Sequence, residues 1–220
     1  MQIRPLTPEL LAEELAERID ALGASGTASR QDGGTPSWLR VAVDGADAAR
    51  PGELADALVE PLRLRGRPVR RIRARDFLRP ASLRFEFGHR DPDAYLDRWL
   101  DTGALFREVF DPTEPGATGE VLPSLWDPVA DRATRAARVA LPPGGVVLLD
   151  GPMLLGRWFP LDLAVHLRLS AAALERRTAP DEHWTLPALA RYDAEVQPEQ
   201  AADMTVRADD PRRPALVVRA

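Results

Sequence analysis

The sequence predicts an α/β protein built on a doubly wound parallel sheet. Short β-rich runs alternate with segments of helical spacing along most of the 220 residues, which is the pattern of repeated βαβ units. The runs at 144–154 and 161–170 have apolar centres, as strands buried on both faces of a parallel sheet do. The length suits one such domain with small appendages.

The first element is a predicted helix that precedes the domain. Pro8 follows Thr7 at a position suited to the first helical turn, and apolar residues recur at helical spacing up to Leu22. Residues 23–37 are rich in glycine, serine and threonine and lack apolar periodicity. We therefore expect an N-terminal helix within 1–22, a flexible linker at 23–37 and the α/β domain at 38–220.

The domain begins with a predicted βαβ unit. A β-rich run at 38–45 ends in a glycine turn, a helical pattern at 51–66 closes at Gly66, and a second β-rich run follows at 68–77. Apolar spacing at 91–111 predicts a helix with Gly103 as its weak point.

The rest of the domain continues the alternation. Short edge strands or a hairpin are expected at 120–127 and 135–141, and a buried strand is expected at each of the two apolar runs. A helix at 171–178 and terminal strands at 202–209 and 214–220 complete the prediction.

Composition excludes several kinds of chemistry. The chain has no cysteine, so disulfides, thiolate metal sites and cysteine nucleophiles are absent. All basic side chains are arginine, so no mechanism can use a lysine ammonium. The net charge of -5 does not point to a nucleic-acid partner, and no segment has the apolar core of a signal peptide or a membrane span. We expect a cytoplasmic protein.

Three other sets of residues are interpreted structurally. The dense arginines between Arg63 and Arg79 predict a solvated helix end and edge strand rather than a nucleic-acid surface. The histidines His89, His166 and His183 are too dispersed for a metal site, and His166 is expected to be a hydrogen-bonded core residue. Trp99 and Trp158 are expected to pack in the core.

The turn after the first strand suggests a degenerate phosphate-binding loop. In the pattern G-x-x-x-x-G-K-[ST], backbone N–H groups cradle phosphates, lysine reaches them and a hydroxyl binds magnesium. Gly45 opens this pattern, but Arg50, Pro51 and Gly52 stand at its other three defining positions. Pro51 has no N–H to offer a phosphate. On spacing alone, the turn is interpreted as an ordinary connection between a strand and a helix.

The order of the segments over 39–218 resembles the uridine kinase-like branch of the P-loop nucleoside kinases, which includes phosphoribulokinase-type relatives. "VAVDGADAARPGELADAL" is similar to that family's first strand, loop and helix, and "IRARDFLRP" to the end of its second strand. "RFEFGHRDPDAYLD" resembles its substrate segment, "VVLLDGPML" its Walker B strand and "LERRTAPDEHW" its lid. "ADMTVRADDPRRP" resembles the segment close to the adenine.

The resemblance implies roles for individual residues. Asp76 would accept the proton of the substrate hydroxyl, and Asp150 would organise magnesium. ATP would bind at the turn and at Asp150. The residues implied in nucleotide binding are Gly45, Asp47, Arg50, Gly52 and Asp150. Those implied in substrate binding are Arg84, Arg90, Asp91 and Tyr95. A small lid at 176–195 would bring Arg176 and Arg177 to the phosphates.

Three hypotheses for function follow. The resemblance implies ATP- and Mg²⁺-dependent phosphorylation of a nucleoside or a related sugar hydroxyl. The altered loop instead favours a kinase-like module that binds a nucleoside or an anionic sugar but no longer transfers phosphate. A third hypothesis is a structural or interaction protein that uses the arginine-dense segment as a partner surface.

Overall fold

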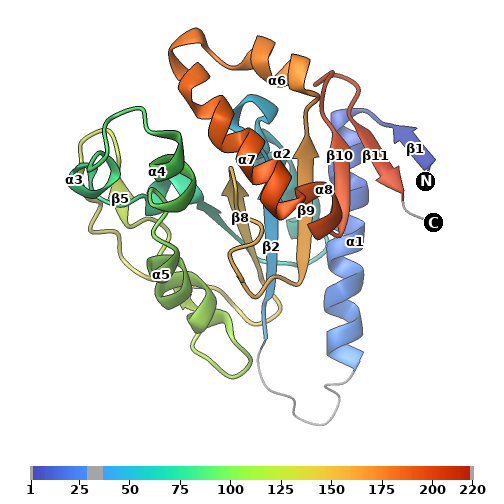
Figure 1. Cartoon of the computed structure of the whole chain (residues 1–220). Helices are drawn as coiled ribbons and strands as arrows, with labels where there is room; N and C mark the ends of the chain where they lie inside the picture. The colour runs from blue at the N-terminus through green and yellow to red at the C-terminus, as the bar shows by residue number, and fades with distance from the viewer. Residues whose placement is uncertain (1, 29–36, 219–220) are drawn as a thin grey trace.

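A computed structural model describes residues 2–28 and 37–218, which form a three-layer α/β structure (Figure 1). Its central sheet has the order β1-β11-β10-β9-β2-β8-β3. The strands are β1 Gln2–Pro5, β2 Leu39–Asp44, β3 Val69–Arg73, β8 Val146–Gly151, β9 Leu163–Arg168, β10 Met204–Arg207 and β11 Ala215–Val218. β10, β9, β2, β8 and β3 are parallel, β11 pairs antiparallel with β10, and β1 pairs antiparallel with β11. The predicted doubly wound parallel sheet is confirmed.

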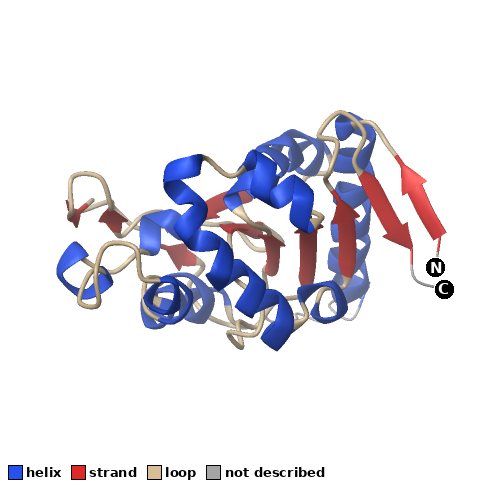
Figure 2. Ribbon diagram, turned by 45° about the horizontal axis from the view of Figure 1, so that its top comes forward, coloured by secondary structure: helices blue, strands red, loops and turns tan. Residues whose placement is uncertain are grey.

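Helices cover both faces of the sheet (Figure 2). α1 Pro8–Ala28 and α2 Pro51–Leu64 pack on one face, where they meet Val41 and Val43 of β2. The opposite face carries Ala42 of β2 and is covered by α5 and the turns around it. The remaining helices are α3 Ala81–Arg84, α4 Pro92–Asp97, α5 Thr102–Leu105, α6 Ala171–Arg177, α7 Leu186–Val196 and α8 Pro198–Ala201. The period-two alternation of side chains in β2 thus divides the core into two layers.

The N-terminal residues are part of this core. β1, which the sequence pattern did not predict, pairs with β11, and α1 buries Leu15 and Ile19 against the sheet. α1 continues beyond Leu22 to Ala28, into the segment predicted as a linker. An ion pair of 2.7 Å between Asp20 and Arg67 ties α1 to the chain after α2. Residues 29–36 of the predicted linker lie outside the described residues.

The single helix predicted at 91–111 is wrong, because the chain leaves the helical path between α4 and α5. Asp91 and Asp101 each accept a backbone N–H three residues ahead, so each starts a new helix. Between them, Leu100 forms a β-bridge with Leu78. A five-residue π-helical turn follows α5 at Phe106–Phe110. The helical path is therefore interrupted between Asp97 and Thr102, whereas Gly103, the predicted weak point, lies inside α5.

The edge elements of the domain form two small antiparallel pairs, as expected. β4 Glu120–Val121 pairs with β7 Val139–Ala140, and β5 Trp126–Asp127 pairs with β6 Arg132–Ala133. Trp158, which was expected to be a packing residue, is instead 92% exposed and has a left-handed backbone at φ 61°. It lies on the connection between β8 and β9, where the chain turns too sharply to bring the indole inward.

A buried carboxylate fixes the carboxyl end of β2. Asp44 has no exposed surface. One oxygen accepts the N–H of Leu154 at 2.8 Å, and the other lies 2.6 Å from Nδ1 of His166 and accepts the hydroxyl of Tyr192 at 3.1 Å. The Tyr192 hydroxyl in turn accepts the N–H of Leu155 at 3.0 Å. Asp44, the last residue of β2, therefore joins three other parts of the chain: the segment after β8, strand β9 and helix α7. The expectation that His166 is a hydrogen-bonded core residue is confirmed.

We expect Tyr192→Phe to destabilise the fold by about 2 kcal/mol, because it removes a hydrogen bond to a carboxylate and leaves the Leu155 N–H unpaired. Denaturant unfolding of the variant and the parent measures this difference. Tyr95→Phe is the matched control, since the Tyr95 hydroxyl has no hydrogen bond to any described residue. Equal losses in the two variants would contradict a special role for the Asp44 network.

Candidate functional site

A large cavity, the main cavity below, lies at the carboxyl ends of the parallel strands. β2 has β8 and then β3 on one side and β9 on the other, so the direction of winding reverses at β2. Ligands of open α/β sheets bind at such a reversal point. The cavity holds about 640 Å³ and is lined by the loops after β2, β3 and β8 and by residues of α4 and α7. Its volume suits a small organic ligand.

One wall of the main cavity is aromatic. Tyr95, Trp99 and Trp184 line it, and their rings contact one another with centroids 5.1 to 5.4 Å apart. The indole N–H of Trp99 is buried and has no partner among the described residues. This wall therefore offers flat apolar surfaces to the cavity.

The rest of the main cavity is charged. Arg157 is held by the carbonyls of Met153 at 2.5 Å and Leu96 at 2.6 Å, and burial lowers its pKa from the ordinary value. Burial raises the pKa of the Asp47 carboxyl, and the nearby Glu182 adds to this while Arg75 opposes it. Burial also raises the pKa of Tyr95, and the same two carboxylates add to that effect. Asp47 therefore brings a poorly solvated negative charge to the wall beside the turn.

The turn after β2 does not form an open phosphate cradle. The N–H of Gly45 donates to Gly151, that of Ala49 to Ala46 and that of Arg50 to Asp47, at 2.7 to 3.1 Å. The last two bonds close a short 3₁₀ turn at Asp47–Ala49, and Pro51 has no N–H. Of these three N–H groups, two are therefore bonded within the turn and one to the end of β8, so none of the three is free to bind an anion.

Arg50 joins this turn to α2. Its backbone is left-handed at φ 58° and ψ 53°, a conformation that disfavours side chains other than those of glycine and asparagine. Its guanidinium points to Glu53, at 3.2 Å, and both side chains are more than half exposed. Arg50 lines the main cavity but is paired outside it.

Asp150 is bound by an arginine of the neighbouring strand. Nε of Arg71 donates to Asp150 at 2.9 Å, and the same guanidinium pairs with Asp56 of α2. The side chains of Arg71 and Asp150 are 14% and 9% exposed. Burial raises the pKa of Asp150, and Arg71 offsets part of this rise.

Gly52 lets the guanidinium of Arg71 reach this position. A Cβ at residue 52 would lie 2.9 Å from an Nη atom of Arg71 and 3.3 Å from the Asp150 carboxylate. The hydroxyl of the loop pattern would begin at this same Cβ. The Arg71 guanidinium therefore lies directly beside both position 52 and Asp150.

The residues present do not fit the predicted magnesium ion. Asp150 is ion-paired with Arg71, Gly52 has no hydroxyl, and the Arg71 guanidinium lies against both position 52 and Asp150. Within residues 2–28 and 37–218, no group of three or more metal-ligating side chains comes together. The predicted role of Asp150 as the residue that organises magnesium therefore does not fit this arrangement.

A second, smaller cavity of about 320 Å³ lies beside Asp150 and shares Asp47, Arg50, Arg75 and Pro152 with the main cavity. Arg71 and Arg73 of β3 also line it. Asp76 lines neither cavity, although it is close enough to Asp150 to raise the pKa of that carboxyl. Burial raises the pKa of Asp76 itself, and Arg73 and Arg75 oppose the rise.

The other residues predicted for substrate and phosphate binding are only partly brought together. Tyr95 and Arg177 line the main cavity. Arg84 is buried and bound to the carbonyl of Arg79 at 2.7 Å, Asp91 caps α4, and Arg90 and Arg176 are exposed away from both cavities. Arg84 and Asp91, which were predicted to bind substrate, thus bind backbone groups close to them in the chain.

A third cavity is small and apolar. It holds about 120 Å³ between α1, the start of α2 and the chain after β10, where Ala208 and Pro211 line it. These two residues belong to the segment that resembles the one close to the adenine.

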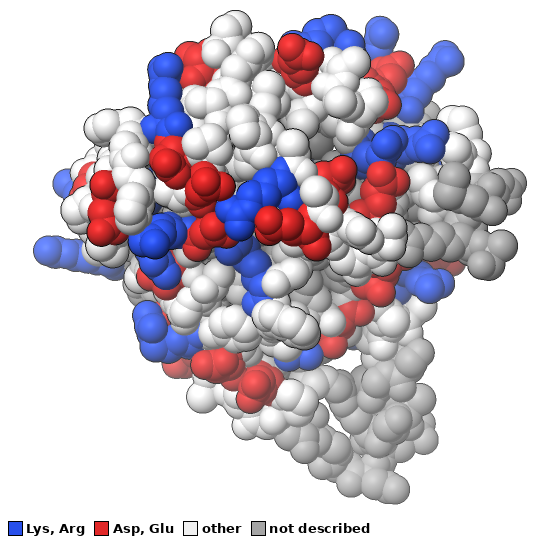
Figure 3. All heavy atoms as spheres, viewed as in Figure 1, with Lys and Arg blue, Asp and Glu red and all other residues white. Residues whose placement is uncertain are grey.

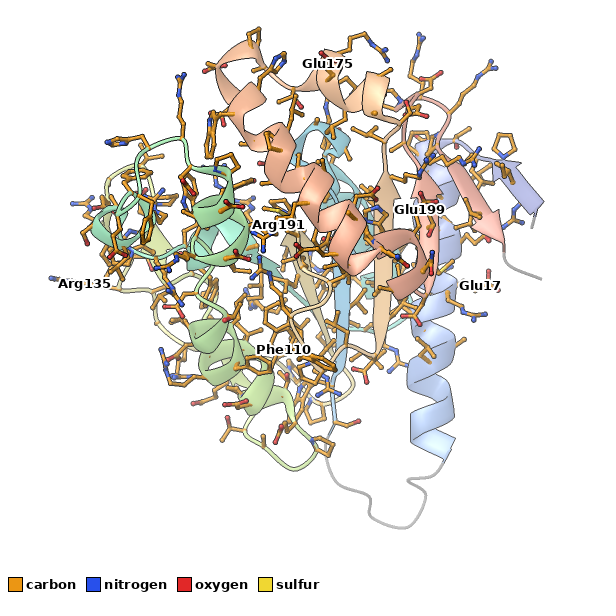
Figure 4. The ribbon with its side chains drawn as sticks, viewed as in Figure 1. Glu17, Phe110, Arg135, Glu175, Arg191 and Glu199 are labelled. Atoms are coloured by element: carbon orange, nitrogen blue, oxygen red, sulfur yellow. The ribbon has the colours of Figure 1, made fainter. Side chains whose placement is uncertain are left out.

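The segment predicted as a lid, residues 176–195, lies across the main cavity. Thr178, Glu182, Trp184 and Leu189 line the cavity from this side. Figure 4 shows Arg191 on α7 beside α4, where it binds Asp93 and Asp97 at 2.9 Å and Glu195 at 2.8 Å. Acidic and basic side chains alternate over this face of the molecule (Figure 3). Arg191 and Tyr192 therefore hold α7 in place over the cavity.

No model of a known protein family matches the sequence, and no curated protein matches it. Among solved structures, a possible uridine kinase from Bacillus stearothermophilus is similar, with a TM-score of 0.62 and 20% identity over 87% of this chain and 98% of that chain. The chain has the P-loop kinase fold.

Two further structures support the P-loop kinase fold. D-glycerate 3-kinase from Cryptococcus neoformans has a TM-score of 0.53 and 16% identity, covering 87% of this chain and 83% of that chain. A candidate fructose transport system kinase from Silicibacter sp. TM1040 has a TM-score of 0.53 and 24% identity, covering 83% and 89%. The resemblance seen in the sequence is confirmed at the level of the P-loop kinase fold.

Sequence reasoning missed several residues of the site. Trp184 and Arg157 line the main cavity, and neither was singled out for ligand binding. Arg71 and Arg75 fell within the arginine-dense segment, which was interpreted as solvated. The predicted edge position of β3 is confirmed. Because side chains alternate between the two faces of a strand, the spacing of Arg71 and Arg73 indicated that they share one face, and this could have identified them as a pair.

We expect Asp47→Asn to stabilise the protein at neutral pH. The pKa of the Asp47 carboxyl is higher in the folded than in the unfolded protein. The folded state is therefore most stable, as far as this group is concerned, below the unfolded pKa, and it loses that stability as pH rises through the folded pKa. The asparagine removes that loss, so the variant should gain stability above this window and match the parent below about pH 3.8. Unfolding curves measured at several pH values test this. A gain that is independent of pH would show that the carboxylate charge is not its cause.

Proposed function

We propose that this protein is a kinase-like binding protein whose main cavity takes a nucleoside or a related sugar, and that it has lost ordinary phosphoryl transfer. The observation that carries the proposal is the contrast between two neighbouring parts of one site. The cavity of about 640 Å³ is open, whereas the phosphate turn uses two of its N–H groups in hydrogen bonds of its own and has a proline without an N–H at position 51.

The chemistry of the main cavity supports such a ligand. Tyr95 and Trp184 offer faces to a flat base or to the apolar face of a sugar ring. Arg157 and Arg177 add positive charge to the rim.

The chemistry of the turn argues against phosphoryl transfer. Catalysis of that reaction is mostly positioning and charge neutralisation by a lysine, backbone donors and magnesium. The chain has no lysine, and three N–H groups of the turn are already bonded, two within the turn and one to β8. Losing even one preorganised group commonly costs about 100-fold in rate.

A second candidate, an ATP-dependent phosphotransferase, is favoured by Asp76. Its raised pKa suits a general base, and it follows β3 at the carboxyl edge of the sheet. The small cavity at Ala208 and Pro211 would then take the adenine of ATP. An assay of ADP release with uridine or fructose as acceptor tests this candidate. Turnover that is abolished by Asp76→Asn would establish it and remove the first proposal.

The binding proposal predicts that uridine or fructose binds in a calorimetric titration without ATP. Trp184→Ala should weaken binding by about tenfold, because it removes one stacking face. Trp158→Ala is the matched control, since this tryptophan is exposed outside the cavity. Neither compound binding to the folded parent would contradict the proposal and favour a protein without a small ligand.

We also expect that restoring the residues of the phosphate-loop pattern gives Mg-ATP binding only when Arg71 is changed as well. Replacing Arg50, Pro51 and Gly52 by Gly, Lys and Thr should not give Mg-ATP binding, because the new Cβ at position 52 meets Arg71. Adding Arg71→Ala should free Asp150 and allow binding, measured by calorimetry. Strong Mg-ATP binding by the triple variant with Arg71 intact would show that Arg71 does not block the site.

A further inference from the structure

Arg71 stands where the P-loop kinase fold would leave room for a cation between position 52 and a strand-end aspartate. It reaches Asp150 through Nε at 2.9 Å and Asp56 through Nη1, and its side chain is 14% exposed. A guanidinium is always charged and offers five donors in a fixed plane. The protein therefore carries a permanent cation at this point, tied by two carboxylates.

Two more arginines face the same cavity without being paired. Arg73 follows Arg71 at the spacing that puts side chains on one face of a strand, and Arg75 lies in the turn directly after β3. Both line the cavity of about 320 Å³. Neither forms an ion pair or a hydrogen bond with its side chain within the part of the chain that the structure describes.

Three of the four acids that line this cavity are paired with two of its arginines. Asp150 and Asp56 bind Arg71, and Glu53 binds Arg50. The fourth acid, Asp47, interacts with Arg75 through its charge, without an ion pair or a hydrogen bond among the described residues. Arg73 and Arg75 are therefore the arginines of this cavity whose guanidinium groups no carboxylate of the described residues binds directly. Guanidinium groups bind phosphate oxygens through paired hydrogen bonds.

We propose that this cavity is a metal-independent site for a phosphate-bearing anion, in which Arg73 and Arg75 bind the phosphate oxygens and Arg71 supplies the fixed positive charge that a bound metal would otherwise provide. The cavity adjoins the main one through Asp47, Arg50, Arg75 and Pro152, so a phosphorylated ligand can span both. The proposal does not depend on the nucleoside in the main cavity.

Pyrophosphate is the probe, because it carries phosphate charge and no base or sugar. We expect calorimetry in EDTA to give saturable binding to the full chain, and added Mg²⁺ not to strengthen it. The double variant Arg73→Ala/Arg75→Ala should weaken binding by about tenfold or more, since each removes a charged hydrogen-bonding group. Arg212→Ala is the matched control, because Arg212 is an exposed arginine outside the cavity.

Three results would overturn the proposal. They are absence of pyrophosphate binding to the folded parent, binding that requires Mg²⁺, and unchanged affinity in the double variant. Because the probe lacks a nucleoside, failure here leaves uridine or fructose binding in the main cavity as a separate result, and failure of that binding leaves this one intact.

A second variant tests the role of Arg71 itself. Arg71→Met keeps much of the side-chain volume but frees Asp150 and Asp56. Mg²⁺ without any anion should then raise the melting temperature of the variant and not that of the parent. Equal responses to Mg²⁺ would contradict the proposed place of Arg71. If circular dichroism shows that Arg71→Met is unfolded, the double variant decides the proposal alone.

Discussion

The site depends on one buried carboxylate. Asp44 is fully enclosed, and a charge in such a place is tolerated only when its lone pairs are satisfied. The donors come from the chain after β8, from His166 in β9 and from Tyr192 in α7, so the charge holds three separate segments against the end of β2. The aromatic wall and the arginines around the main cavity are built on the edge that this network fixes.

The same edge carries two kinds of surface with different chemistry. On the α4 and α7 side, Tyr95, Trp99 and Trp184 leave a cavity that suits a ring-shaped ligand. On the β3 side, the 3₁₀ turn at Asp47–Ala49 is closed by two backbone hydrogen bonds of its own, and Arg71 binds Asp150. A phosphate-binding turn and a bound metal ion usually act together, because both neutralise the negative charge of the phosphates. In this protein the turn and the metal position are both altered, and arginines stand beside them, so an anion site made of guanidinium groups is consistent with both changes.

The fold was predictable because it rests on local patterns. The apolar centres of β8 and β9 and the glycine turn after β2 stand in the sequence itself, and their order is that of the P-loop kinase fold. The predictions that failed involve contacts distant in the chain. The helix expected at 91–111 is split because Asp91 and Asp101 both cap helices, and because Leu100 pairs with Leu78. Trp158 was expected inside, yet the turn after β8 leaves it in solvent.

The sequence by itself determined the sheet, the absence of lysine and the loss of an N–H at Pro51, because composition and short-range pattern are properties of the chain alone. Only the tertiary structure decided what replaces the missing groups. Arg71 and Asp150 are 79 residues apart, and their pairing follows from the parallel register that sets Arg73 beside Asp150. Asp44 and Tyr192 meet only because α7 crosses the carboxyl edge of the sheet. Such pairings depend on how strands and helices stack in space, which no local pattern of residues specifies.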